Sequence, residues 1–164
     1  MENQFEKFKK EIRNEIVSAD RAFDFQLTKE FLDWFINAGT FFSETHLDIP
    51  QETIVTNTTV GNCFHNSQLV SLQNEGILYF EGIIRGATSG KLIHHGFNLL
   101  DKKILDVSHL SNKENFLEEL KDKTFFYFGI AFENDFIKKN PDVLTVKYLN
   151  NPFILKYYQE SITL

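Results

Sequence analysis

The segment from residue 77 to residue 85, ILYFEGIIR, constrains the fold more strongly than any other part of the chain. In an extended strand successive side chains point to opposite faces, and here both faces are mostly apolar. Such a strand is stable when it is covered on both sides, which predicts a central position in its sheet. We therefore expect an α+β domain in which helices pack on an antiparallel sheet built around this strand.

Helices are expected to form the N-terminal part, residues 1–52, of a single domain. Apolar residues at three- and four-residue spacing predict a first helix with one apolar face, made by Phe5, Phe8, Ile12 and Ile16. A second helix is predicted over residues 28–38, with Gly39 placed to end it as a C-cap. Residues 40–51 are predicted to be a loop.

The sheet is expected in the central part, residues 53–132, and a further strand and helix in residues 133–164. Alternating and β-branched segments predict strands at 53–60, 77–85, 92–100, 103–107, 124–130 and 142–149. Capping residues and apolar spacing predict helices at 63–73, 112–121, 134–139 and from Pro152 onward. The polar turn between residues 100 and 103 predicts an antiparallel hairpin.

Charge and composition exclude several classes of function. The 164 residues carry a formal net charge of −6, which disfavours nonspecific binding to nucleic acid or to anionic membranes. No apolar run approaches the roughly 20 residues of a membrane span, and the charged, amphipathic N-terminus differs from a signal peptide. The single cysteine cannot form an internal disulfide and fits a reducing compartment. We expect a cytoplasmic protein, with delivery into another cell left open.

Phenylalanine is unusually frequent in this chain, with 18 residues. Aromatic residues at this density predict a bulky core, and they also offer an apolar surface for a protein partner or for a homodimer contact. A non-catalytic module that binds a protein partner is therefore one alternative for this chain.

Cys63 is the candidate nucleophile of this chain. Gly61 and Asn62 break the preceding predicted strand, so Cys63 stands at the start of the next helix. A helix N-terminus offers backbone N–H groups and a partial positive charge, which favour a thiolate and can stabilise an oxyanion. The alternative is an inert cysteine that packs as a small apolar residue.

His95 and Asp106 supply the two other parts of a thiol hydrolase site. Alternation along the predicted strand puts His95 on one face and turns His94 to the other. If Leu99 pairs with Ile104 across the turn, Asp106 lies diagonally from His95, at the roughly 7–8 Å that side chains can bridge. The carboxylate would then fix the imidazole tautomer and leave the second ring nitrogen to take the thiol proton.

Two further polar residues are candidates for supporting roles. Asn66 lies one helical turn after Cys63, where it can orient a substrate or tie down a loop. Glu81 lies in the apolar central strand and either borders the site or serves as a structural, hydrogen-bonding acid. No cofactor and no metal are expected. The cysteine, the two histidines and the aspartate leave zinc as an alternative, although adjacent histidines of a strand point to opposite faces.

These motifs resemble, in content and order, those of small bacterial and phage proteins related to papain-like and transglutaminase-like cysteine hydrolases. Residues 61–67, GNCFHNS, resemble the nucleophile motif C-[YF]-x-N-[AS]. The later motifs Y-x-E-G, H-A-W, I-D-P-T and Y-x-G-[IV]-x-F have counterparts at residues 79–82, 95–97, 105–108 and 127–132. Gly96 and Phe97 replace Ala-Trp, and Val107 and Ser108 replace Pro-Thr. The similarity covers about half of the chain, residues 59–132.

The resemblance implies a papain-like or transglutaminase-like core with Cys63 as nucleophile, His95 as base and Asp106 as its orienting acid. Papain-like enzymes also carry a side-chain oxyanion donor upstream of the nucleophile, and Asn62 and Asn57 are candidates by position. The implied reaction is hydrolysis of a protein, a peptide or a small amide through a thioester, as in a peptidase, amidase or deamidase. An amine in place of water would make the protein a transglutaminase-like acyltransferase.

Overall fold

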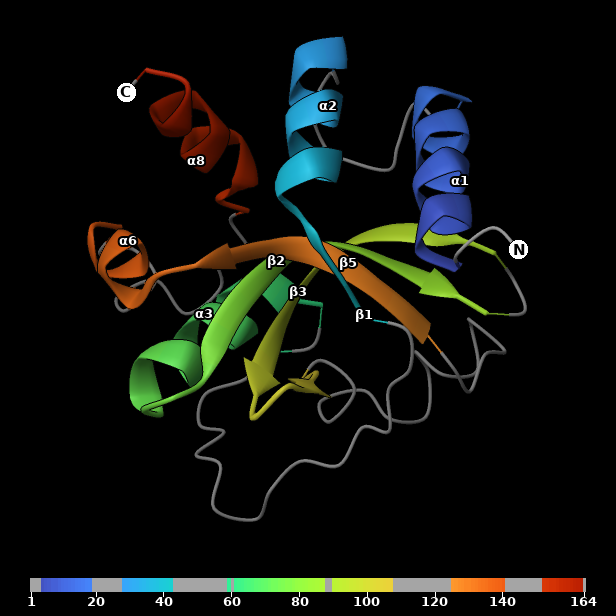
Figure 1. The fold of residues 1–164 in the computed structure, drawn as a ribbon. Helices are drawn as coiled ribbons and strands as arrows, with labels where there is room; N and C mark the ends of the chain where they lie inside the picture. Colours follow the sequence, from blue (N-terminus) through green and yellow to red (C-terminus); the bar gives the residue numbers. More distant parts are fainter. Residues whose placement is uncertain are drawn as a thin grey trace.

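The computed structural model describes residues 4–18, 28–42, 59, 61–87, 90–107, 125–140 and 152–163. In these ranges helices pack on a curled antiparallel sheet, which confirms the α+β class (Figure 1). The helices on one side of the sheet in this view are α1 (Gln4–Ser18), α2 (Lys29–Ala38) and α8 (Ile154–Ser161). The helix α3 (Cys63–Gln73) lies against β2 and β3, and the short α6 (Asn134–Lys138) contacts α3.

The sheet has five strands in the order β1-β5-β2-β3-β4, and every neighbouring pair is antiparallel. The strands are β1 (Thr40–Phe42), β2 (Leu78–Gly86), β3 (Leu92–Leu100), β4 (Lys103–Leu105) and β5 (Phe125–Phe132). Tyr79 and Ile83 of β2 pack with residues of α1, α2 and α8, whereas Phe80 and Ile84 pack with residues of β3 and β5. Both faces of β2 are thus buried, and its predicted central position is confirmed.

Local signals explain where α2 begins and why a glycine follows it. Thr28 caps the helix, because its Oγ1 accepts a hydrogen bond from Phe31 N at 3.1 Å. Gly39 is the C-cap of the helix, as predicted, and its N–H donates to Phe35 O at 3.0 Å, although its backbone is extended rather than left-handed. A side chain at Gly39 would collide with the ring of Phe128, and this packing explains the glycine.

β3 and β4 form the predicted hairpin. The turn residues Asp101 and Lys102 have φ values of 48° and 65°, as a two-residue type I′ turn requires. Leu99 lies opposite Ile104, which is the register on which the predicted site depends. β4 is shorter than expected and ends at Leu105, so Asp106 follows the ladder directly.

The predicted loop at residues 40–51 is wrong in its first part, since Thr40–Phe42 forms the edge strand β1 against β5. Three residues are too few to show an alternating pattern, and pairing with β5 decides their conformation. The predicted helix at 112–121, the strand at 142–149 and, apart from Thr59, the strand at 53–60 lie outside the described residues. The other predicted bounds agree with the structure to within two residues. Among the described helices, none has the length and apolar character needed to span a membrane.

Candidate active site

Cys63 is the first residue of α3, as predicted, and it is a free, half-buried thiol. Asn62 occupies the N-cap position, and Asn66 N donates the first hydrogen bond of the helix to Asn62 O at 2.9 Å. The N–H groups of Cys63 and of the next two residues therefore have no acceptor within the helix. They favour a negative charge on the sulfur or on an oxygen bound beside it.

Hydrogen bonds from buried polar side chains fix α3 against β3. Eight of its eleven residues, Phe64 to Ser71, are buried. Ser67 Oγ donates to Gly96 O at 2.9 Å, and Asn98 Nδ2 donates to Ser67 O at 2.8 Å. Buried polar groups are stable only with such partners. Because Gly96 follows His95 in β3, these bonds hold the first turns of α3 beside the histidine.

Gly96 lets the start of α3 approach β3 closely. A Cβ at this position would lie 2.9 Å from Phe64 Cα and 3.2 Å from Cys63 O, which is tighter than side chains normally allow. A glycine within a strand commonly marks such a close approach of two backbones. An alanine here would push the nucleophile helix away from the strand that carries His95.

The predicted pairing of His95 with Asp106 is present. His95 Nε2 lies 2.7 Å from Asp106 Oδ2. His95 is 2% exposed and Asp106 0%, so water does not screen the pair. With Asp106 on Nε2, Nδ1 is the nitrogen that remains for a third group.

Cys63 is within hydrogen-bonding reach of the His95 side chain. Burial by itself lowers the pKa of His95, but the charges of Asp106 and Cys63 and hydrogen bonds to both raise it to about 10. The imidazole is therefore protonated at neutral pH, between a carboxylate and a sulfur. The protonated ring therefore lies between Asp106 and Cys63 at the start of α3.

Tyr127 of β5 is a part of this site to which the sequence analysis gave no role. Its Oη donates to Asp106 Oδ2 at 2.9 Å, the oxygen that also meets His95. Burial, followed by the charge of Asp106, raises the pKa of Tyr127 well above its ordinary value, so the phenol stays a donor. The only signal in the sequence was the place of Tyr127 at the start of the Y-x-G segment, and no spacing connects that segment to Asp106.

The asparagines near Cys63 have separate roles. Asn66 Nδ2 donates to Thr59 O at 2.9 Å and Asn66 Oδ1 accepts from Thr59 N at 3.0 Å, so Asn66 ties down the chain that leads into α3. The side chain of Asn62 makes no capping hydrogen bond to the helix. Asn62 therefore remains a candidate oxyanion donor. Asn57, the other candidate, lies outside the described residues.

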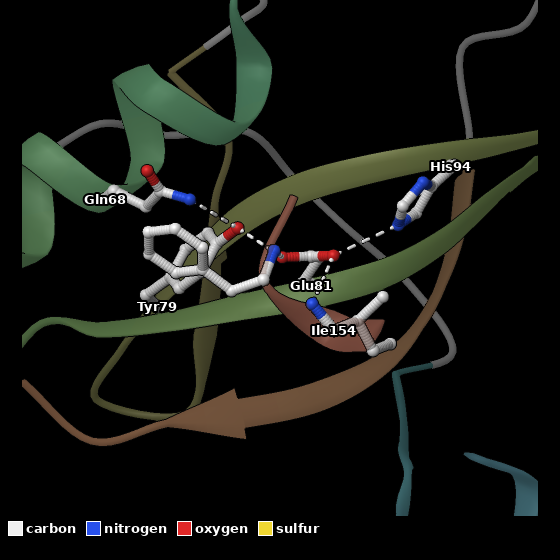
Figure 2. A network of polar contacts seen from close by, with 6 residues as sticks. Gln68, Tyr79, Glu81, His94 and Ile154 are labelled. Carbon is white, nitrogen blue, oxygen red and sulfur yellow. Dashed lines mark hydrogen bonds and ion pairs between the residues drawn. The ribbon is translucent and has the colours of Figure 1, made fainter. Parts of the chain in front are cut away.

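Glu81 belongs to a second buried cluster, which Figure 2 shows. Its carboxylate accepts hydrogen bonds from Tyr79 Oη at 2.8 Å, Phe153 N at 2.6 Å and Ile154 N at 2.9 Å. The two backbone donors begin α8, so Glu81 caps that helix from within the sheet. Gln68 of α3 donates to Tyr79 Oη at 3.2 Å and joins the cluster (Figure 2). Of the two roles considered for Glu81, these contacts are those of a structural acid.

His94 enters this second cluster, as strand alternation predicts. Its Nε2 lies 3.2 Å from Glu81 Oε1 (Figure 2). Its ring packs on Phe64 with the ring centroids 4.7 Å apart. Consecutive residues of α3, Cys63 and Phe64, thus meet the consecutive histidines of β3.

Within the described part of the chain, no group of three or more His, Cys, Asp or Glu side chains is arranged to hold a metal ion. No family model, curated protein or solved structure matches the chain.

Proposed function

We propose that the protein is a cysteine-dependent acyl hydrolase that works through a thioester on Cys63. The observation that carries the proposal is the position of His95, which lies 2.7 Å from the Asp106 carboxylate and interacts with Cys63 at the N-terminus of α3. Nucleophile, acid–base group and orienting acid have the roles of a hydrolase triad. We extend the proposal to the fold, as a papain-like or transglutaminase-like core, on the strength of the motif order alone.

In the proposed mechanism, acylation begins from a thiolate on Cys63 and an imidazolium on His95. Cys63 Sγ attacks the acyl carbon of an amide, and the backbone N–H groups at the start of α3 stabilise the oxyanion that forms. The oxyanion then collapses and the carbon–nitrogen bond breaks. The His95 imidazolium gives its proton to the leaving amine, which leaves a thioester on Cys63 and a neutral imidazole.

Deacylation would use the same groups, with His95 acting as a base instead of an acid. A thioester sulfur carries no charge, so acylation of Cys63 removes one of the two attractions that raise the pKa of His95. The neutral imidazole can then take a proton from water while Asp106 holds the ring. The water oxygen attacks the thioester carbon, the carboxylic acid leaves, and the thiolate and imidazolium are restored.

The proposed substrate is a protein, a peptide or a small amide, met in a reducing compartment such as the cytoplasm, where Cys63 stays a free thiol. An amine that enters in place of water would turn the same thioester into the intermediate of an acyl transfer. The two reactions differ in the second nucleophile and share everything before it.

The test is formation of an acyl-enzyme from p-nitrophenyl acetate, followed by intact-mass spectrometry and by release of nitrophenol. We expect acetylation at Cys63 with continued turnover, and loss of both in Cys63→Ala. His95→Gln should slow turnover by at least about 100-fold, because thiolate formation and water activation both need the imidazole. His94→Gln is the matched control, and its turnover should stay within a few-fold of the wild type.

Acetylation of Cys63 no faster than that of free cysteine, together with no effect of His95→Gln, would contradict the proposal and favour a non-catalytic binding module. Added glycinamide separates the two resolving nucleophiles. Faster turnover with formation of acetylglycinamide would indicate acyl transfer, and unchanged turnover would indicate hydrolysis.

A further inference from the structure

Asp106 differs from the other two site residues because it lies outside the helices and paired strands. Cys63 lies in α3 and His95 lies within β3, whereas the ladder between β3 and β4 ends at Leu105. Asp106 follows that ladder, so strand pairing does not fix its backbone. Side-chain contacts therefore help to set its position against His95.

Tyr127 supplies such a contact from a distant strand. In the sheet order β2 separates β5 from β3, yet Tyr127 Oη reaches Asp106 Oδ2 at 2.9 Å. The Tyr127 ring is 0% exposed and packs edge-on against Phe97 with centroids 4.9 Å apart. The packed ring makes the hydroxyl a rigid donor whose direction is set by the core.

Gly82 allows β5 to lie close to β2. It lies in β2 between Gly129 of β5 and His95 of β3. A Cβ at Gly82 would collide with the β5 backbone at Phe128 O. Gly82 and Gly129, which lie opposite each other, have no side chains, so β5 and β2 can approach closely at this position. His95 of β3 lies on the other side of Gly82.

We propose that Tyr127 is a positioning residue, which holds the Asp106 carboxylate against His95 through its phenol hydrogen bond. Asp106 Oδ2 meets both partners, so fixing this oxygen from β5 also fixes the direction in which it meets His95 Nε2. The expected effect on acyl transfer rests on the proposed hydrolase function. The effect on the His95–Asp106 pair does not depend on any activity.

The test compares Tyr127→Phe, which removes the hydroxyl and keeps the ring, with Tyr79→Phe as the matched control. Tyr79 is equally buried, and its Oη also donates to a buried carboxylate, that of Glu81. Tyr127→Phe removes the hydrogen bond to Asp106, whereas Tyr79→Phe removes two, the one donated to Glu81 and the one accepted from Gln68. Both variants should therefore unfold at lower denaturant concentrations, Tyr79→Phe at the lower of the two. Two readouts then separate them: NMR of the His95 ring and turnover of p-nitrophenyl acetate.

In Tyr127→Phe we expect faster solvent exchange of the His95 Nε2 proton, a lower titration midpoint of His95 and about tenfold slower turnover, the effect of one hydrogen bond. In Tyr79→Phe all three should match the wild type. A His95 midpoint in Tyr127→Phe equal to or above that of the wild type would overturn the proposal, as would equal changes in Tyr79→Phe. If the wild type does not acetylate Cys63, the hydrolase function fails, and the NMR comparison still decides the role of Tyr127.

Discussion

Two histidines that are adjacent in β3 enter two different buried clusters, and each lies beside a carboxylate. His95 Nε2 is 2.7 Å from Asp106, and His94 Nε2 is 3.2 Å from Glu81. Glu81 lies in the central strand and caps α8 through two backbone N–H groups, whereas Asp106 follows a short edge strand. The two pairs therefore share a chemistry and differ in their surroundings.

The difference teaches that the other contacts of the ring distinguish the structural histidine–carboxylate pair, His94 and Glu81, from the pair proposed to be catalytic, His95 and Asp106. The ring of His94 packs on Phe64, which offers no reactive atom. The ring of His95 meets Cys63, whose charge helps to raise the pKa of His95. The Glu81 carboxylate also caps α8, so a change in its charge would destabilise the fold.

The largest effect should come from Asp106→Asn. An amide at this position cannot accept from His95 and Tyr127 as a carboxylate does, and it can hold the imidazole in the wrong tautomer. We expect turnover of p-nitrophenyl acetate to fall by about 10²–10⁴-fold with the fold intact by circular dichroism. Turnover within a few-fold of the wild type would remove Asp106 from the site.

The same chemical change at Glu81 should affect stability instead. Glu81→Gln leaves an amide nitrogen among the four donors that the carboxylate now satisfies. We expect the free energy of unfolding, measured in urea, to fall by about 3 kcal/mol, while the folded protein keeps its acetylation rate within a few-fold. A large loss of turnover with little loss of stability would contradict the structural role of Glu81.

The raised pKa of His95 predicts how stability changes with pH. The folded state binds this proton more tightly than the unfolded chain, so the contribution is complete below about pH 6.5 and is lost as pH rises toward about 10. A cysteine thiol of the unfolded chain ionises in the same range, so the measurement belongs in Cys63→Ala. Without the charge of Cys63 the pKa of His95 should be lower, so this contribution to stability should be lost completely below pH 10.

In Cys63→Ala we expect the free energy of unfolding to fall above pH 6.5 with a slope of at most about 1.4 kcal/mol per pH unit. The double variant Cys63→Ala/His95→Gln should lack this part of the fall, and Cys63→Ala/His94→Gln should keep it. Identical pH profiles for the three proteins would show that His95 gains no proton affinity on folding.

Alternation and turn chemistry are the reasons why much of the arrangement could be predicted. The two apolar faces of residues 77–85 indicated the central strand, and the short polar turn at Asp101 gave the hairpin register. That register, with strand parity, brought His95 and not His94 to Asp106. Each of these inferences uses residues that are close in the sequence, where geometry is nearly fixed.

The parts that could not be predicted depend on contacts between distant segments. The donors that define Glu81 as a helix cap come from Phe153 and Ile154, 72 and 73 residues away. Tyr127 of β5 reaches Asp106, which follows β4, across three strand pairings, and no periodicity in the sequence connects them. Thr40–Phe42 becomes a strand only because β5 offers it an edge. Local propensity does not contain these contacts.

The central claim is that His95, and not His94, activates Cys63, and alkylation of the single cysteine by iodoacetamide at pH 6.5 tests it most directly. An ordinary thiol with a pKa of about 8.5 is only about 1% thiolate at this pH. We predict alkylation several-fold faster in the native protein than in the urea-unfolded chain, slowed to or below the unfolded rate by His95→Gln and unchanged by His94→Gln. A native rate no faster than the unfolded one, or one that His95→Gln leaves unchanged, would contradict the account.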